Sequence, residues 1–295
     1  VPDALEATYG SSAFVADAID TDGDGVSDYL EDIYGSDKTN NAIFPQFTVG
    51  LDNTFATGGI SNLDLYPGVE YPESLVQDSN SQIYVGGHGV TSGIEEHGSV
   101  YKLNTAGLLD TNFGTNGLKM ITGDPNRVRD IALLDDTKIV AVGEINEGDP
   151  EQQHGLTAVL NTVDGSYDNG FNSGSLLSSS TTEWQQFWSV AVQPNGKIIA
   201  AGNTYDSKYI ETHPLVTNAT DMYSIRYNSD GTADTVGASF NTNQIERASA
   251  VAVQTDGKIV VLGNNINVDT GDIIVLRYLA DGITLDTTFD AGNDG

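Results

Sequence analysis

Val251-Ala-Val-Gln-Thr-Asp-Gly-Lys-Ile-Val-Val-Leu-Gly263 contains two short apolar runs on either side of Asp256-Gly257. An Asp-Gly pair between apolar runs is the strongest short-range signal for a β-hairpin, because both turn residues can adopt positive φ. The Val and Ile residues of the two runs favour strands. The stretch therefore predicts two antiparallel strands, the second of which ends at Gly263.

The same pattern recurs upstream. Val190-Ala-Val-Gln-Pro-Asn-Gly196 repeats the first strand and the turn, and Lys197-Ile-Ile-Ala-Ala-Gly202 repeats the second strand. A third strand follows in each unit, as in Ile274–Tyr278. The glycine that closes the second strand recurs at spacings of 56, 59 and 61 residues, at Gly87, Gly143, Gly202 and Gly263.

A second repeated element ends in phenylalanine, and its clearest copy is Leu285-Asp-Thr-Thr-Phe289. We call this element the anchor. Its aromatic positions are spaced by 58, 58, 69 and 49 residues and are Phe55, Phe113, Phe171, Phe240 and Phe289. We expect the Leu and Phe of each anchor to pack between units and not to bind a ligand.

Each unit offers three clear strands and a fourth near the anchor. One small sheet cannot bury both of its faces alone, so the units have to stack on one another. We predict an all-β, four-bladed β-propeller of about 60-residue repeats over residues 45–295, preceded by a separate segment over residues 1–44. The alternative is part of a larger propeller with further repeats. A β-trefoil fits the repeat count less well.

The repeats resemble the delta-60 family of bacterial extracellular proteins over about residues 45–291. The match is best at 251–289, good at 190–227, and weaker in the first unit, which lacks the Asp-Gly-Lys turn. The resemblance implies propeller blades in a secreted or surface protein. The family has no established catalytic residues, so the resemblance transfers none.

The segment 1–44 contains one sharp motif, a twelve-residue loop from Asp20 to Glu31 with Gly25 at its sixth position. Acidic residues fill loop positions 1, 3, 5, 9 and 12, which is the spacing of EF-hand calcium loops. The competing interpretation is a solvated acidic turn, but five carboxylates repel one another without a cation. We predict that Ca²⁺ is bound by Asp20, Asp22, Asp24, the carbonyl of Val26, Asp28 and Glu31, and that a short helix follows over Ser27–Tyr34.

Residues Asp20–Asn40 also resemble the thrombospondin type 3-like calcium repeats of bacterial surface proteins. The family pattern continues after the helix with Gly-Thr-Asp-Pro, whereas this chain has Gly35-Ser-Asp-Lys38. Such repeats usually occur in tandem, and this chain has one. Both departures put Asp37 in doubt as an extra ligand.

Charge and composition exclude several classes of protein. The chain has 12 Lys and Arg against 42 Asp and Glu, a net charge of −30, which argues against a nucleic-acid partner. No apolar run approaches the roughly 18 residues of a membrane span, so we expect no membrane insertion. The absence of cysteine excludes disulfides and thiol chemistry. The composition favours a secreted or cell-surface protein.

A search for catalytic motifs finds no zinc-binding histidine pair, no nucleophile elbow and no phosphate loop. The four histidines, His88, His97, His154 and His213, are expected to be solvated loop residues. Two inserts, 144–155 and 203–222, follow equivalent strands and are expected on one face. Trp184, Phe187 and Trp188 form an aromatic cluster, for which packing is favoured over sugar binding.

These observations favour a non-catalytic, calcium-binding structural or adhesive module, and not an enzyme. Its expected partners are other extracellular or surface proteins or glycans, with self-assembly into a filament as a further option. The first alternative is a carbohydrate-binding propeller that uses the inserted loops. The second alternative is a glycoside hydrolase of the sialidase type, although the Asp-box tryptophan and a cluster of arginines are missing.

Removal of calcium is expected to loosen residues 15–40, because the carboxylates of the loop then repel one another without compensation. Circular dichroism and limited proteolysis in calcium and in EGTA measure this effect. Unchanged spectra and cleavage patterns on addition of EGTA would count against the site.

Overall fold

The computed structural model describes residues 51–65, 69–90, 96–122, 126–146, 153–179, 184–205, 220–234, 238–240, 245–266 and 271–289. The chain divides into two compact units, Val1–Asn53 and Thr54–Gly295, and every strand reported below belongs to the second unit. The predicted calcium ligands Asp20, Asp22, Asp24, Val26, Asp28 and Glu31 lie outside the described residues, as does the predicted helix over Ser27–Tyr34.

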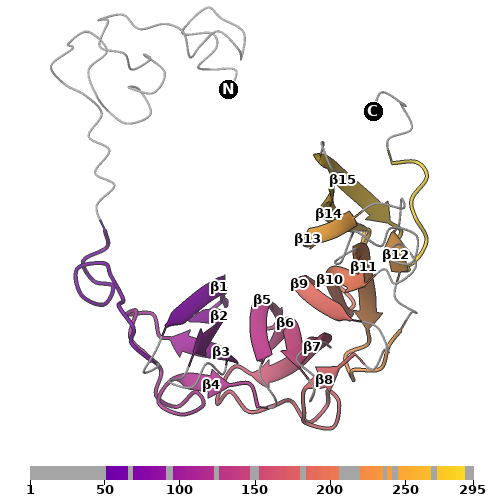
Figure 1. Cartoon of the computed structure of the whole chain (residues 1–295). Coiled ribbons are helices and arrows are strands. Elements are labelled where there is room, and N and C mark those ends of the chain that lie inside the picture. Colours follow the sequence, from indigo (N-terminus) through magenta and orange to yellow (C-terminus); the bar gives the residue numbers. More distant parts are fainter. Residues whose placement is uncertain are drawn as a thin grey trace, which may run out of the picture. The chain divides into compact units, whose positions relative to one another are not determined.

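The described strands form four sheets (Figure 1). The first contains β1 (Glu70–Gln77), β2 (Ile83–Val90), β3 (Glu96–Leu103) and β4 (Leu118–Met120). The second contains β5 (Asn126–Asp135), β6 (Lys138–Asn146), β7 (Gln153–Asn161) and β8 (Leu177–Ser178). The third contains β9 (Gln185–Val192), β10 (Ile198–Tyr205), β11 (Thr220–Tyr227) and β12 (Ala238–Phe240). The fourth contains β13 (Ile245–Val253), β14 (Ile259–Ile266) and β15 (Gly271–Tyr278).

Strands adjacent in the chain are adjacent and antiparallel in every sheet. The predicted hairpin turns are present: Gly196 and Gly257 have φ of 80° and 83°, and their N–H groups donate to the carbonyls of Gln193 and Gln254. Among the described residues no helix occurs. The predicted all-β class and the repeated three-strand unit are confirmed.

The glycine that closes each second strand lies against a carbonyl of the first strand. A Cβ atom on Gly202 would lie 1.8 Å from the carbonyl oxygen of Gln186, and one on Gly143 would lie 1.9 Å from that of Arg127. Gly87 and Gly263 meet the corresponding carbonyls at 2.2 Å and 2.3 Å. Any side chain at these positions would force the two strands apart, which explains the strongest periodic signal in the sequence.

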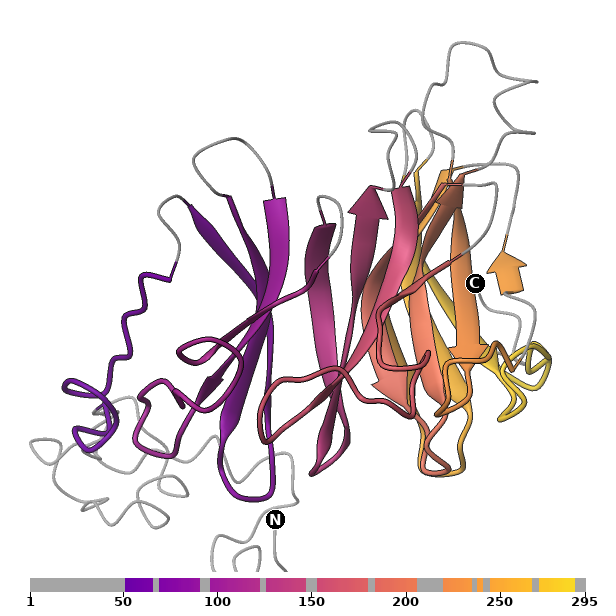
Figure 2. The same ribbon diagram turned by 90° about the horizontal axis from the view of Figure 1, so that it is seen from below.

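Consecutive sheets pack face to face and lie side by side in both views of the molecule (Figure 1, Figure 2). Each of the three junctions holds one apolar cluster. The largest side chains at the first junction are Tyr84, Phe113, Leu156 and Leu160. Those at the second are Phe171, Phe187, Ile198 and Tyr227, and those at the third are Ile199, Met222, Ile259 and Tyr278. Burial of apolar surface between sheets is therefore what holds the units together.

The anchors connect each unit to the next. Phe113 and Phe171 are fully buried, and a Cβ atom on the turn glycine of the following unit, Gly165 or Gly231, would contact their rings at 3.1 Å and 3.3 Å. The residue after each Phe donates a backbone hydrogen bond to that turn: Gly114 to Asp164 and Asn172 to Asp230, at 2.8 Å and 2.9 Å. The predicted packing role is confirmed for these two phenylalanines.

At the two ends of the repeat region, the leucine of the anchor does not pack between units. Leu51 and Leu285 are exposed, by 60% and 45%. The prediction that the anchor leucines pack between units is wrong at these two positions.

The aspartates of three anchors each pair with a basic residue of their own unit. Nζ of Lys102 lies 3.0 Å from Asp110, and Nζ of Lys138 lies 3.0 Å from Asp168. In the fourth sheet Arg277 lies 2.9 Å from Asp286. Hydrogen bonds from Thr288 and the charge of Arg277 lower the pKa of Asp286 to about 2. These pairs fix the path of the chain between the third strand and the anchor.

Substitution of the buried anchor ring, Phe171→Ala, is expected to reduce the free energy of unfolding by about 3–5 kcal/mol, because it leaves a cavity between two sheets. The matched variant Phe289→Ala removes a ring that is 36% exposed and should cost about 1 kcal/mol or less. Urea unfolding followed by the fluorescence of Trp184 and Trp188 measures both. Equal losses for the two variants would contradict the packing role of the anchor.

Candidate functional site

The first strand of every sheet contains a β-bulge. The pairing register skips one residue beside the closing glycine in each of β1, β5, β9 and β13. In β5 it skips a second residue, Leu134, further along the strand. A bulge leaves an extra residue outside the ladder and redirects its side chain, and bulges are common next to active sites. The four residues skipped beside the closing glycines, here called the bulge row, are Glu73, Arg129, Trp188 and Ser249.

Arg129 connects three members of the bulge row. Its Nη1 atom donates to Oε1 of Glu73 at 2.9 Å, across the junction of the first and second sheets. Its guanidinium carbon lies 4.6 Å from the ring centroid of Trp188, across the next junction. A cation over an indole face is an attractive arrangement. One residue thus joins side chains from three consecutive sheets.

A buried carboxylate holds this arginine in place. Glu144, at the end of β6, has a side chain that is 2% exposed and accepts hydrogen bonds from Nη2 and Nε of Arg129 at 2.7 Å and 3.1 Å. Arg127 donates to Glu144 at 3.4 Å and also binds Glu96. The hydrogen bond from Arg127 lowers the pKa of Glu96 and raises that of Arg127. Three carboxylates and two guanidinium groups give the cluster a net charge of −1.

His88 stands beside this cluster on β2. Its Nδ1 atom lies 3.6 Å from Oε1 of Glu73, is buried, and has no hydrogen-bond partner in the described part of the chain. Burial, followed by the charges of Arg129 and Arg127, lowers the pKa of His88. The imidazole is therefore neutral near pH 7.

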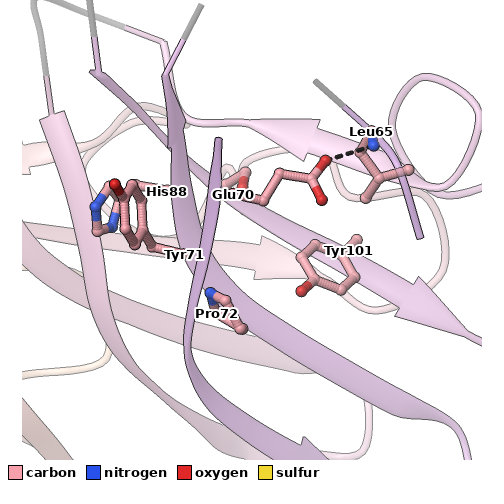
Figure 3. Close-up of a pocket in the computed structure, with 7 residues that line it drawn as sticks. Leu65, Glu70, Tyr71, Pro72, His88 and Tyr101 are labelled. Carbon is pink, nitrogen blue, oxygen red and sulfur yellow. Dashed lines mark hydrogen bonds between the residues drawn. The ribbon is translucent and has the colours of Figure 1, made fainter. Parts of the chain in front are cut away.

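Tyr71 stacks on His88, with ring centroids 4.9 Å apart and an angle of 19° between the planes. Both residues line a small pocket on the first sheet (Figure 3). Figure 3 also shows Glu70 accepting a hydrogen bond from the backbone N–H of Leu65, with Tyr101 nearby. Apolar ring faces next to a few polar groups are the usual lining of a site for a small polar molecule.

The structure corrects the prediction about the histidines. His88, His97 and His154 lie in β2, β3 and β7, not in solvated loops, and His213 lies outside the described residues. The strands extend further into the inserts than the apolar pattern indicates, because polar residues at their ends still pair. In the first insert, for example, β6 continues to Asn146 and β7 starts at Gln153.

The aromatic cluster divides between two roles. Phe187 is fully buried and stacks on Tyr223 at 6.4 Å, which confirms a packing role for this residue. Trp188 belongs to the bulge row, and its buried Nε1 has no hydrogen-bond partner among the described residues. The carbonyl of Trp184 accepts a hydrogen bond from Thr204.

Sequence reasoning missed Glu73, Arg129 and Glu144. The available signal was the run Arg127-Val-Arg-Asp130, in which two charged residues are adjacent where a strand should alternate. That adjacency marks the bulge. Among the described residues, no group of three or more His, Asp or Glu side chains is arranged to hold a metal ion. The described part of the chain also contains no helix long and apolar enough to cross a membrane.

A family model described as a domain of unknown function (DUF5122) β-propeller matches residues 254–289. An ulvan lyase of the polysaccharide lyase family PL25 has a similar structure, with a TM-score of 0.51 and 11% identity over 73% of this chain and 54% of that one. The described sheets form a β-propeller. The chain spans about half the length of the lyase. The match to the family model covers β14, β15 and the anchor that follows them, where the repeat is clearest.

Two glycoside hydrolases are also similar in structure, each with a TM-score of 0.38. The GH43 endo-arabinanase from Bacillus licheniformis is 11% identical over 74% of both chains. The xylan β-1,4-xylosidase from Bacillus halodurans C-125 is 10% identical over 76% of this chain and 42% of that one. No curated protein matches the chain in sequence.

These comparisons correct the expected function. The likeness to a polysaccharide lyase contradicts the predictions of a non-catalytic structural or adhesive module and of a protein that is not an enzyme. The carbohydrate-directed alternatives fit better. The prediction failed because it relied on missing linear motifs, whereas the polar cluster is assembled from single residues of several sheets.

The lowered pKa of His88 predicts a specific pH dependence of stability. The folded state prefers the neutral imidazole, so its contribution is complete above the unfolded pKa of about 6.5 and is lost as the pH falls below that value. Replacement of the residue, His88→Gln, should therefore flatten the decrease in unfolding free energy between about pH 7.5 and pH 5.5. Urea titrations at each pH measure this. An unchanged slope in His88→Gln would refute the assignment.

Proposed function

We propose that the protein is a carbohydrate-active β-propeller that binds a polysaccharide across the bulge row. The observation that carries the proposal is the convergence of Glu73, Arg129 and Trp188 from three sheets, next to the neutral His88. First strands with bulges present these side chains on a rigid scaffold, which is what a binding site for a long, repetitive ligand requires. The similarity to propellers that act on polysaccharides supports the same class of ligand.

The charge of the molecule favours a neutral polysaccharide. The net charge of −30 repels a polyanion. The two guanidinium groups of the cluster are already bound to carboxylates of the same cluster, and the five charged groups sum to −1. A sulfated or uronate-rich chain would have to compete with Glu73, Glu96 and Glu144 for these arginines.

Each residue has a distinct role in the proposal. Glu73, whose side chain is 29% exposed, is the carboxylate able to reach a sugar hydroxyl or a glycosidic oxygen. His88 is the second group that can exchange a proton. Trp188 and Tyr71 supply ring faces for contact with the sugar. Glu144 is a positioning residue because it is buried and acts through Arg129.

Hydrolytic activity is tested with neutral polysaccharides such as arabinan and xylan and with ulvan as the anionic comparison. New reducing ends report hydrolysis, and ultraviolet absorbance of unsaturated uronates reports elimination. Glu73→Gln is expected to lower kcat/KM about a hundredfold or more, as for loss of an acid–base group. Glu96→Gln is the matched control, because its side chain is also 29% exposed and also pairs with an arginine, and its effect should be much smaller. Turnover of ulvan alone would contradict the preference for neutral chains.

A second candidate is binding without catalysis, because Glu73 and Glu144 share the guanidinium of Arg129. Retention on a polysaccharide column without product formation, lost in Trp188→Ala, supports this version. Absence of both binding and turnover on the whole panel would reject the carbohydrate proposal.

Several predictions from the sequence remain part of the proposal. The protein acts outside the cell, as the composition and the delta-60 resemblance indicate. Its repeats are of the delta-60 type and number four. The loop Asp20–Glu31, resembling a thrombospondin type 3 repeat, binds Ca²⁺ and stiffens the acidic segment before the propeller. Glycans and other surface proteins are its partners, and nucleic acid is not.

A further inference from the structure

One face of the fourth sheet differs from the matching faces of the other three. The side chains that each of the first three sheets turns toward its successor are buried, as at Val100, Val142 and Ala201. The second and third strands pair in the same register relative to the closing glycine in all four sheets, so equivalent positions of the fourth sheet can be identified. There the side chains are apolar and exposed, by 40% at Leu262, 43% at Val275 and 80% at Ile273.

The complementary surface is exposed on the first sheet. In the second and third sheets, Ile131 and Val190 of the first strand insert against the preceding sheet and are buried. The equivalent residue of β1 is Leu75, which pairs with Val85 as Ile131 pairs with Ala141, and its side chain is 68% exposed. The chain therefore presents both halves of its own repeated junction, one on each terminal sheet.

A polar contact of the junction is available as well. At two internal junctions a basic residue of the third strand donates to a carbonyl in the turn of the next unit: Lys102 to Thr162, at 3.0 Å, and Arg226 to Ala280. Arg277 occupies this position in the fourth sheet. The equivalent carbonyl of the first sheet belongs to Thr105. Leu103 and Leu160 occupy the same position in their sheets, and Thr105 and Thr162 each follow two residues later.

Two contacts of the internal junctions are missing from this pair of surfaces. At each internal junction a backbone N–H in the first strand of the following sheet donates to a side-chain oxygen in the first strand of the preceding one. The acceptors are Ser74, Asp130 and Ser189, at 3.4 Å, 2.9 Å and 3.2 Å respectively. The fourth sheet has Ala250 at this position, which has no such oxygen. The turn of the first sheet is also already filled, because a Cβ atom on Gly107 would lie 2.7 Å from the ring of Phe55. Association through these faces is therefore weaker than an internal junction.

We propose that the exposed face of β14 and β15 binds the exposed face of the first sheet of a second copy of this chain, head to tail. The contact repeats the geometry of the three internal junctions and buries Leu262, Ile273 and Val275 against Leu75. The contact is heterologous, so a dimer still has one free face of each kind, on its two ends. Assemblies can therefore grow by adding copies or close into a ring. The charge of −30 opposes association, and added salt promotes it by screening.

The test is light scattering and sedimentation of the full chain over a range of concentrations, at low and high salt. We expect reversible association that increases with concentration and with salt. Val275→Glu and Leu75→Glu should each abolish it. Val163→Glu adds the same charge at a residue that is 73% exposed on a turn away from both faces, and it should associate as the wild type does. Circular dichroism checks that each variant is folded.

A mixture of the two deficient variants gives the decisive result. Each retains one intact face, so head-to-tail binding predicts a 1:1 dimer that cannot grow further. A wild-type protein that is monomeric at every concentration overturns the proposal, and so does a cross-link between positions 75 and 275 within a single chain, which would mean that the sheet binds its own first sheet. Association that survives both substitutions overturns it as well. None of these outcomes depends on carbohydrate activity.

Discussion

The close approach of a backbone carbonyl to a glycine in each unit is the constraint on which the rest of the structure depends. At 1.8–2.3 Å from a would-be Cβ atom, these carbonyls leave no room for a side chain at Gly87, Gly143, Gly202 and Gly263. The approach occurs next to the β-bulge of the first strand, where one residue leaves the ladder. The same local feature thus sets the repeat in the sequence and supplies the residues of the candidate site.

Because of this constraint, different strands of a unit have different roles. The second and third strands are mostly apolar and are buried where they face a neighbouring sheet, so the polar residues in their middle are few and small, such as Ser99 and Thr157. The bulged residue is released from pairing and from the core, and its identity varies freely: glutamate, arginine, tryptophan and serine. Variation at one position per sheet gives the row its mixed chemistry while the packing between sheets stays the same.

The sequence was a good guide to what repeats and a poor guide to what does not. The Asp-Gly turns, the closing glycines and Phe113 and Phe171 were predicted correctly, because each obeys a local or periodic rule. The bulge row was not predicted, since Glu73, Arg129 and Trp188 are about 56–59 residues apart and look like ordinary surface residues in isolation. His88 was misplaced for a related reason: glycines surround it, and only the pairing of β2 with β1 and β3 shows that the strand continues through it. The calcium loop keeps its status as a prediction.

The sheets differ in how many neighbouring sheets they pack against, and this difference determines where the molecule unfolds first. The second and third sheets are packed on both faces, whereas the first and the fourth are each packed on one face. In a linear array of repeats, local stability is the sum of what a unit contributes by itself and what each junction adds. Partial unfolding therefore starts at the first and fourth sheets and proceeds toward the middle, so these two sheets exchange their amide hydrogens first and are the first to yield to a protease or to a pulling force.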